Sequence, residues 1–218
     1  AFFPSLSAGW VVSQEDFWGN FGIDYLKVRA SWGQNGSDAN LPGNEDKEFW
    51  TGAGIRIPNA LGAYYPGYQI DKMVNTDLRW ERSEQLDLGV DLRFLEGRLS
   101  ATADYYNKQT KDLIVLATPP LSVGLNPSFI NGGNVANTGF DFEIGYNDKA
   151  GDFNYGVNLN VSTVKNEVTS INSPTPIMGA NVRGSDVTVF EEGFPIWYFY
   201  GYKTDGIDPQ TGRPIVVN

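Results

Sequence analysis

The 218-residue sequence contains no cysteine and no histidine. Without them there is no disulfide framework, no thiol nucleophile, no usual zinc ligand and no histidine-dependent catalytic triad. The chain also has no run of about 18 apolar residues, so we expect no transmembrane helix, although this test does not detect transmembrane strands. We therefore expect no enzymatic activity, no cofactor and no metal ion.

Positive charge is scarce as well. Lysine and arginine total 16 against 26 acidic residues, which gives a formal net charge of −10. A nucleic-acid partner requires a basic stripe that releases counterions, and a membrane-surface helix requires a basic face, so neither is expected. The 14% aromatic content argues against a disordered chain. Because the chain opens at Ala1 without an initiator methionine or signal peptide, we interpret residues 1–218 as a single partial domain of a longer protein.

Alternation of apolar and polar residues is the main pattern that is present. In SEQLDLGVDLRFLEGRLSATADYYNK, from Ser83 to Lys108, one set of alternate residues is almost wholly apolar and the other almost wholly polar. A period of two is typical of strands, and the interruption at Glu96–Arg98 predicts a tight hairpin turn. The same pattern predicts six strands, at residues 4–12, 24–33, 83–94, 99–108, 138–147 and 153–164.

The connections between these segments alternate in length. The third-to-fourth and fifth-to-sixth links are short, whereas long segments lie at residues 33–82, at 117–134 and after residue 171. If the strands are antiparallel, all three long segments emerge at the same end. The link between the first two strands, SQEDFWGNFGI, belongs to the short side and is compatible with a helical turn.

Two architectures fit alternating strands, a soluble β-sandwich and a transmembrane β-barrel. Strands of about ten residues, tilted by about 45°, rise about 23 Å, which is close to the apolar band of an outer-membrane barrel. Aromatic residues near the strand ends, with short turns on one side and long loops on the other, are also typical of such barrels. We therefore expect an all-β, antiparallel barrel segment of six or seven strands, with further strands outside this sequence, because an open sheet edge is not viable in hydrocarbon.

The barrel interpretation assigns an environment to each side chain along the strands. Residues predicted to face lipid are Leu26, Val28, Leu86, Leu88, Val90, Leu92, Leu99, Phe140, Phe142, Ile144, Val157 and Leu159. Residues predicted to face the lumen are Lys27, Arg29, Asp87, Asp91, Arg93, Asp104, Asp141, Glu143, Asn158 and Asn160.

Several stretches resemble the SusC-like (SusC/RagA) TonB-dependent transporters of the bacterial outer membrane, in the expected order along nearly the whole chain. They are FPSLSAGWVVSQEDF, DYLKVRASWGQNG, LRWERSEQLDLGVDLRFLEGRLSATADYYNKQTKDLI, NGGNVANTGFDFEIGYN and PIWYFYGYKTDGI. The resemblance implies part of the C-terminal half of a 22-stranded barrel in the outer membrane, filled by an N-terminal plug. It also implies TonB-driven import of glycans or peptides together with a SusD-like surface lipoprotein.

The same resemblance leaves parts of the family pattern unmatched. The plug and the TonB box have no counterpart within residues 1–218. Residues 172–218 are expected to form either an extracellular excursion or a descending strand, and the excursion is preferred.

Aromatic residues in the loop at 33–82 are the candidate substrate contacts, because their rings could stack on sugars or peptide side chains. The same residues could instead form the loop's own small core. They are Phe49, Trp50, Tyr64, Tyr65 and Tyr68.

Two other function classes stay open: a soluble carbohydrate-binding sandwich, which alternating strands also fit, and a polysaccharide-cleaving enzyme, which paired carboxylates suggest. Asp87 and Asp91 share a face but are about 13 Å apart along a strand, whereas retaining glycosidases need about 5 to 5.5 Å. Glu191 and Glu192 are adjacent and would point to opposite sides of an extended chain. The enzyme hypothesis is therefore the weaker of the two.

Overall fold

Six antiparallel strands form one continuous sheet in the computed structural model, which describes residues 2–19, 22–39, 41, 43, 50–58, 64–72 and 74–217. Their order in the sheet is β1-β2-β5-β6-β7-β8, so each strand pairs with its neighbour in this list. The bounds are β1 Ser5–Val11, β2 Tyr25–Ser37, β5 Glu81–Phe94, β6 Leu99–Ala117, β7 Ser128–Ala150 and β8 Phe153–Ile171. The six predicted strands are thus confirmed. No helix among the described residues has the length and apolar character to cross a bilayer.

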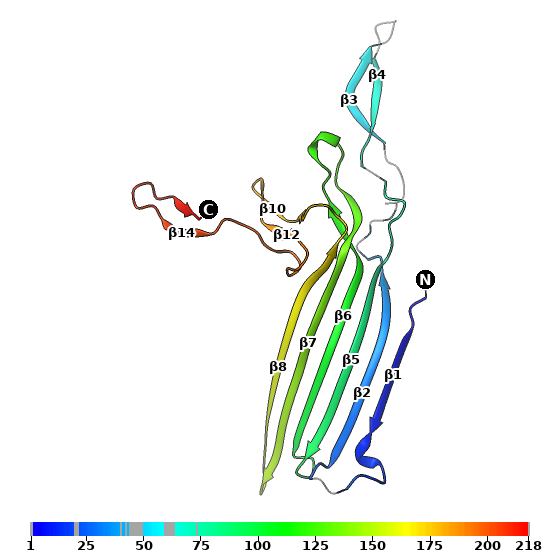
Figure 1. Cartoon of the computed structure of the whole chain (residues 1–218), viewed down its shortest axis with the longest axis vertical. Coiled ribbons are helices and arrows are strands. Elements are labelled where there is room, and N and C mark those ends of the chain that lie inside the picture. The colour runs from blue at the N-terminus through cyan, green and yellow to red at the C-terminus, as the bar shows by residue number, and fades with distance from the viewer. Residues whose placement is uncertain are drawn as a thin grey trace.

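The remaining elements are short and lie in the connections. The helical turn η1 follows β1, and the β3–β4 hairpin lies between β2 and β5 (Figure 1). The bounds are η1 Val12–Gln14, β3 Trp50–Pro58, β4 Tyr64–Ile70, η2 Leu121–Val123, β9 Ile177–Met178, β10 Asn181–Val182, β11 Ser185–Asp186, β12 Thr188–Phe190, β13 Tyr198–Phe199, β14 Thr204–Ile207 and β15 Pro214–Val216.

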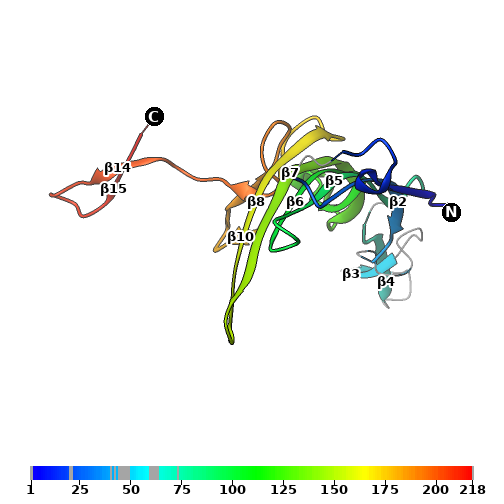
Figure 2. The ribbon, with the colours of Figure 1, turned by 90° about the horizontal axis from the view of Figure 1, so that it is seen from below.

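Both ends of the sheet have a distinct character. Figure 1 shows the η1 link and the β5–β6 and β7–β8 turns at the lower end, and the three long connections at the upper end, as expected from the connection lengths. The β5–β6 turn passes through Leu95, Glu96 and Gly97, all with positive φ. Figure 2 shows the β7–β8 hairpin splayed away from β1 and β2, so the sheet is not flat.

The structure corrects one predicted connection and adds short strands within two of the long segments. β6 and β7 continue to Ala117 and from Ser128, so their connection spans residues 118–127 and not 117–134. The β3–β4 hairpin was not predicted, and residues 172–217 contain only strands of four residues or fewer. The extensions were missed because the alternation is lost there: in β6 a polar run at residues 109–112 is followed by an unbroken apolar run at 113–117, and in β7 polar residues and glycines occupy both faces at 131–137.

A small hydrophobic core lies at the upper end of β6–β8. Segment 177–197 folds back there, and Val168 and Phe190 are fully buried. Two backbone hydrogen bonds join Val168 to Gly193 and Phe194. The buried members are Val115, Val135, Val168, Ile177 and Phe190, with Leu113, Ile130, Ile171, Ile196 and Trp197 packed against them.

Candidate functional site

Strand register sorts the sheet into two faces. Lys27 pairs with Asp91, and Arg29, Gly89, Asp104 and Asp141 form one continuous row across β2, β5, β6 and β7. We call this the polar face, and it carries all ten residues predicted to face a lumen. The opposite side, the apolar face, carries all twelve residues predicted to face lipid. What each face meets stays a prediction.

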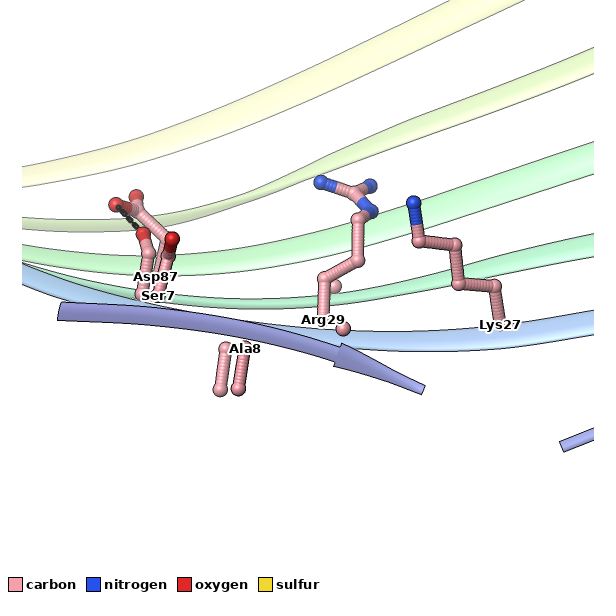
Figure 3. Close-up of a pocket in the computed structure, with 9 residues that line it drawn as sticks. Ser7, Ala8, Lys27, Arg29 and Asp87 are labelled. Carbon is pink, nitrogen blue, oxygen red and sulfur yellow. Dashed lines mark hydrogen bonds between the residues drawn. The ribbon is translucent and has the colours of Figure 1, made fainter. Parts of the chain in front are cut away.

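A close view of β1 and β2 makes the separation visible. Figure 3 shows Ser7, Lys27, Arg29 and Asp87 on the side toward which the later strands of the sheet rise, whereas Ala8 points to the opposite side. These four polar residues belong to one open hollow of the polar face. A charged surface follows from this arrangement, and it runs along the strands.

The centre of the polar face is an ion-pair network on Arg29. Its Nε lies 2.9 Å from Asp91 Oδ2, and its Nη2 lies 3.0 Å from Asp104 Oδ1. To reach Asp104 on β6, Arg29 of β2 crosses β5 at Gly89. A Cβ added to Gly89 would stand 2.2 Å from Asp104 Oδ1 and 2.8 Å from Arg29 Cζ. Glycine therefore provides the space in which one cation joins carboxylates from two strands.

Other polar groups on this face are also fixed by neighbours. Asp87 accepts hydrogen bonds from Ser31 Oγ at 3.1 Å and Gln85 Nε2 at 2.8 Å. The Tyr106 ring lies over Gly139, where an added Cβ would approach the Tyr106 hydroxyl to 2.6 Å. Side chains bound to one another in this way form a polar surface with many hydrogen-bond donors and acceptors.

Large apolar side chains on the other face are open to solvent in this chain. Val157 is 69% exposed, and Leu88, Phe140 and Leu159 are also exposed, although they belong to the most regular part of the sheet. Leu26, Val28, Val90, Leu92, Leu99 and Ile144 are partly exposed. A soluble sandwich would cover such a face with a second sheet.

Polar groups and aromatic rings mark the upper and lower limits of this apolar face. At the upper end, Trp32 Nε1 donates to Glu84 at 3.0 Å and Lys111 Nζ lies 2.8 Å from Glu84. At the lower end, Tyr146 donates to Asp148 at 2.8 Å. On β5 the apolar stretch runs from Leu86 to Phe94, and these nine residues at about 3.3 Å each match the span of a tilted transmembrane strand.

Four of the five aromatic residues predicted to contact substrate are on the β3–β4 hairpin, beyond the upper end of the sheet (Figure 1). Backbone pairing places Trp50 opposite Ile70, Tyr64 opposite Pro58, Tyr65 opposite Ile57 and Tyr68 opposite Gly52. Tyr68 is exposed. The side chains of Trp50, Tyr64 and Tyr65, and the whole of Phe49, lie outside the described part of the structure. The ligand contacts of all five stay a prediction.

Sequence reasoning missed a second aromatic group, in the segment that folds back over β8. Phe194 and Tyr198 stack with ring centroids 4.7 Å apart, and Tyr198 donates to Glu191 at 2.6 Å. This hydrogen bond to a carboxylate raises the pKa of Tyr198 to about 12. Asn166 Oδ1 accepts from the backbone of Ile196 at 2.6 Å and anchors the segment to the polar face. The dense aromatic run at residues 197–202 was the available signal.

Neither carboxylate pair weighed for catalysis is arranged as an acid–base pair. Asp91 is bound to Arg29, and Glu191 accepts the Tyr198 hydroxyl. Within the described residues, no three carboxylates come together in a group that could hold a metal ion. The polar face offers charged and hydrogen-bonding groups that can contact polar molecules.

Comparisons with known proteins agree with this geometry. A family model described as "TonB dependent receptor-like, beta-barrel" matches residues 1–211. "TonB-dependent receptor P26" of Formosa agariphila is 32% identical over 174 residues, which cover 78% of this chain and 17% of that protein. "TonB-dependent receptor SusC" of Bacteroides thetaiotaomicron is 29% identical over 184 residues, covering 78% of this chain and 17% of that protein.

A solved structure, "Structure of the RagAB peptide transporter", superposes with a TM-score of 0.78 at 24% identity, covering 98% of this chain and 23% of that one. At this identity the likeness shows the fold. The chain spans only about a fifth of the length of these proteins.

Proposed function

Since the chain belongs to the TonB-dependent receptor-like β-barrel family, we propose that it forms part of the wall of an active importer in the bacterial outer membrane. The observation that carries this proposal is the two-faced sheet. Its apolar face is open between two boundaries of aromatic and charged residues, and its polar face carries the Arg29 network. Lipid then covers the apolar face, and the polar face lines the lumen.

Orientation follows from the connections. Barrels of this kind have short periplasmic turns and long extracellular loops, so the β5–β6 and β7–β8 turns lie in the periplasm. The β3–β4 hairpin and residues 172–217 then lie at the extracellular end, where they help to form the chamber that receives substrate. The chain acts by contact with the passing molecule, as a transporter wall and not as an enzyme.

The cargo we propose is an oligosaccharide, with a peptide as the alternative, delivered with a SusD-like surface lipoprotein. Exposed aromatic side chains on the extracellular segments suit stacking against sugar rings or peptide side chains. The polar face supplies hydrogen-bonding groups along the path. TonB would act through a plug domain outside residues 1–218.

A transport assay tests this proposal. Cells carrying the complete protein are given fluorescent oligosaccharides or fluorescent peptides of similar mass, with and without a functional TonB. We expect TonB-dependent uptake of the oligosaccharides and co-purification of a surface lipoprotein. Uptake of peptides alone would show that the cargo is a peptide and not an oligosaccharide. Absence of the protein from the outer-membrane fraction would refute the proposal as a whole.

A further inference from the structure

The outer surface above the apolar face carries an unusual pair of cations. Arg82 of β5 pairs directly with Lys111 of β6, so the two positive side chains leave the sheet side by side. They share a face with Leu86, because Arg82, Glu84 and Leu86 are alternate residues of one strand. Like charges directly opposite each other destabilise a sheet, so this position calls for an anion.

The protein supplies only part of the negative charge needed. Glu84 Oε2 lies 2.8 Å from Lys111 Nζ, and Glu84 Oε1 accepts from Trp32. Arg82 is exposed, and its side chain has no hydrogen bond or ion pair to any residue that the structure describes. Two cations thus share one carboxylate, and one guanidinium fork remains open.

Other cations on the same outer face are already matched. Lys165, near the upper end of β8, pairs with Glu167. At the lower end, Arg98 of the β5–β6 turn pairs with Asp148 at 3.3 Å. β5 and β6 also have sheet neighbours on both sides, β2 and β7. Completing the barrel would therefore add strands elsewhere and would leave Arg82 pointing outward.

The height of the pair identifies its surroundings. At about 3.3 Å per residue and a tilt of about 45°, Glu84 and Arg82 stand about 5 and 9 Å above Leu86, the last apolar residue of β5 on this face. Lipid headgroups occupy this level, since they add about 5 to 8 Å to each side of the hydrocarbon. Trp32, directly opposite Leu86, is at the aromatic boundary.

We propose that Arg82 and Lys111 form a binding site for a phosphate group of the outer-leaflet glycolipid. The planar guanidinium offers paired N–H donors to phosphate oxygens, and the lysine ammonium adds a second charge-assisted contact. Glu84 holds Lys111 in place beside Trp32. This inference rests on the proposed function, because it requires the apolar face to meet lipid with the long connections outside the cell.

Binding of phosphorylated lipid A to the complete barrel tests the site. The protein is purified in a neutral detergent, and its thermal unfolding is followed as lipid A, dephosphorylated lipid A or inorganic phosphate is added. We expect phosphorylated lipid A to stabilise the wild type, and Arg82→Gln or Lys111→Gln to weaken its apparent affinity about tenfold. Inorganic phosphate and dephosphorylated lipid A should have little effect.

Lys108→Gln is the matched control, because Lys108 is an exposed lysine three residues from Lys111 on the polar face. It should bind lipid A like the wild type. Equal affinities in all variants, or equal stabilisation by dephosphorylated lipid A, would overturn the phosphate site. Outer-membrane fractionation of the wild type and the variants distinguishes a failure of the phosphate site from a failure of the proposed function. If the proposed function is wrong, even the wild type will be missing from the outer-membrane fraction.

Discussion

Two adjacent residues of β6 offer a direct test of which face meets lipid. Ala103 belongs to the apolar face and pairs with Val90 and Phe142, whereas Thr102 belongs to the polar face and pairs with Asp91 and Glu143. Arginine can be placed at either position in the same strand at nearly the same height. The two substitutions therefore differ mainly in the medium that receives the charge.

The expected cost follows from depth. Val90, the partner of Ala103, has four residues of the Leu86–Phe94 stretch on each side, which places it about 9 Å from either end of the apolar stretch. Arginine at the bilayer midplane destabilises a barrel by about 2 to 4 kcal/mol. Ala103→Arg should then lower the folding equilibrium constant about 30-fold to 700-fold. Thr102→Arg should stay within about 0.5 kcal/mol, because two carboxylates flank it.

Equilibrium unfolding of the complete barrel in lipid vesicles, by guanidinium titration at constant pH, measures the difference. If the apolar face were exposed to water, Ala103→Arg would be an ordinary surface substitution on an exposed residue and would cost no more than about 0.5 kcal/mol. Equal costs for the two variants, or a larger cost for Thr102→Arg, would refute the assignment of the faces.

Three further predictions address other parts of the chain. Gly89→Ala should destabilise the barrel by about 1 to 3 kcal/mol in the same titration, because its Cβ would displace the arginine that crosses it, whereas Gly201→Ala, with open space around it, should be neutral. Phe190→Ala should destabilise the packing of residues 177–197 on the sheet by about 3 to 5 kcal/mol. Limited proteolysis should then cleave residues 177–197 while the sheet stays resistant, and unchanged cleavage would contradict the described core. The pKa of Tyr198 is raised from 10.0 to about 12, so its hydrogen bond to Glu191 is fully present below pH 10 and is lost as the pH passes about 12. Ultraviolet titration should show this late ionisation disappear in Tyr198→Phe and shift toward pH 10 in Glu191→Gln; the same titration curve in wild type and Glu191→Gln would disprove the pairing.

The regular strands were predictable because, where one face of the sheet is apolar, apolar and polar residues alternate along the sequence. Residues such as Leu86 and Leu88 report both the strand and its register, so the whole sorting of side chains into two faces followed from the sequence. The prediction stopped where both faces turn polar, as at Asn134 and Asn137 in β7, because nothing in the pattern separates a strand from a polar loop there.

Contacts between distant residues were beyond sequence reasoning. The crossing of Arg29 over Gly89 depends on which strands become neighbours, and alternation alone does not give that order. The packing of Phe190 against Val168 was also hidden, because the segment that carries it has only very short strands. The aromatic density at residues 197–202 is a signal of packing in the sequence, but it does not identify the packing partner.

The unpaired edges of the sheet predict how residues 1–218 behave as an isolated chain. Among the residues that the structure describes, β1 pairs only with β2, and β8 pairs only with β7 while its upper end is hydrogen-bonded to Gly193 and Phe194. Below that point β8 offers a long row of free backbone donors and acceptors, and β1 offers another. Separate copies would join through these rows and stack their apolar faces, so the isolated chain should form fibrils or amorphous aggregates. The segment should therefore keep a unique shape only where both of its edge strands are paired, as they would be within a closed barrel.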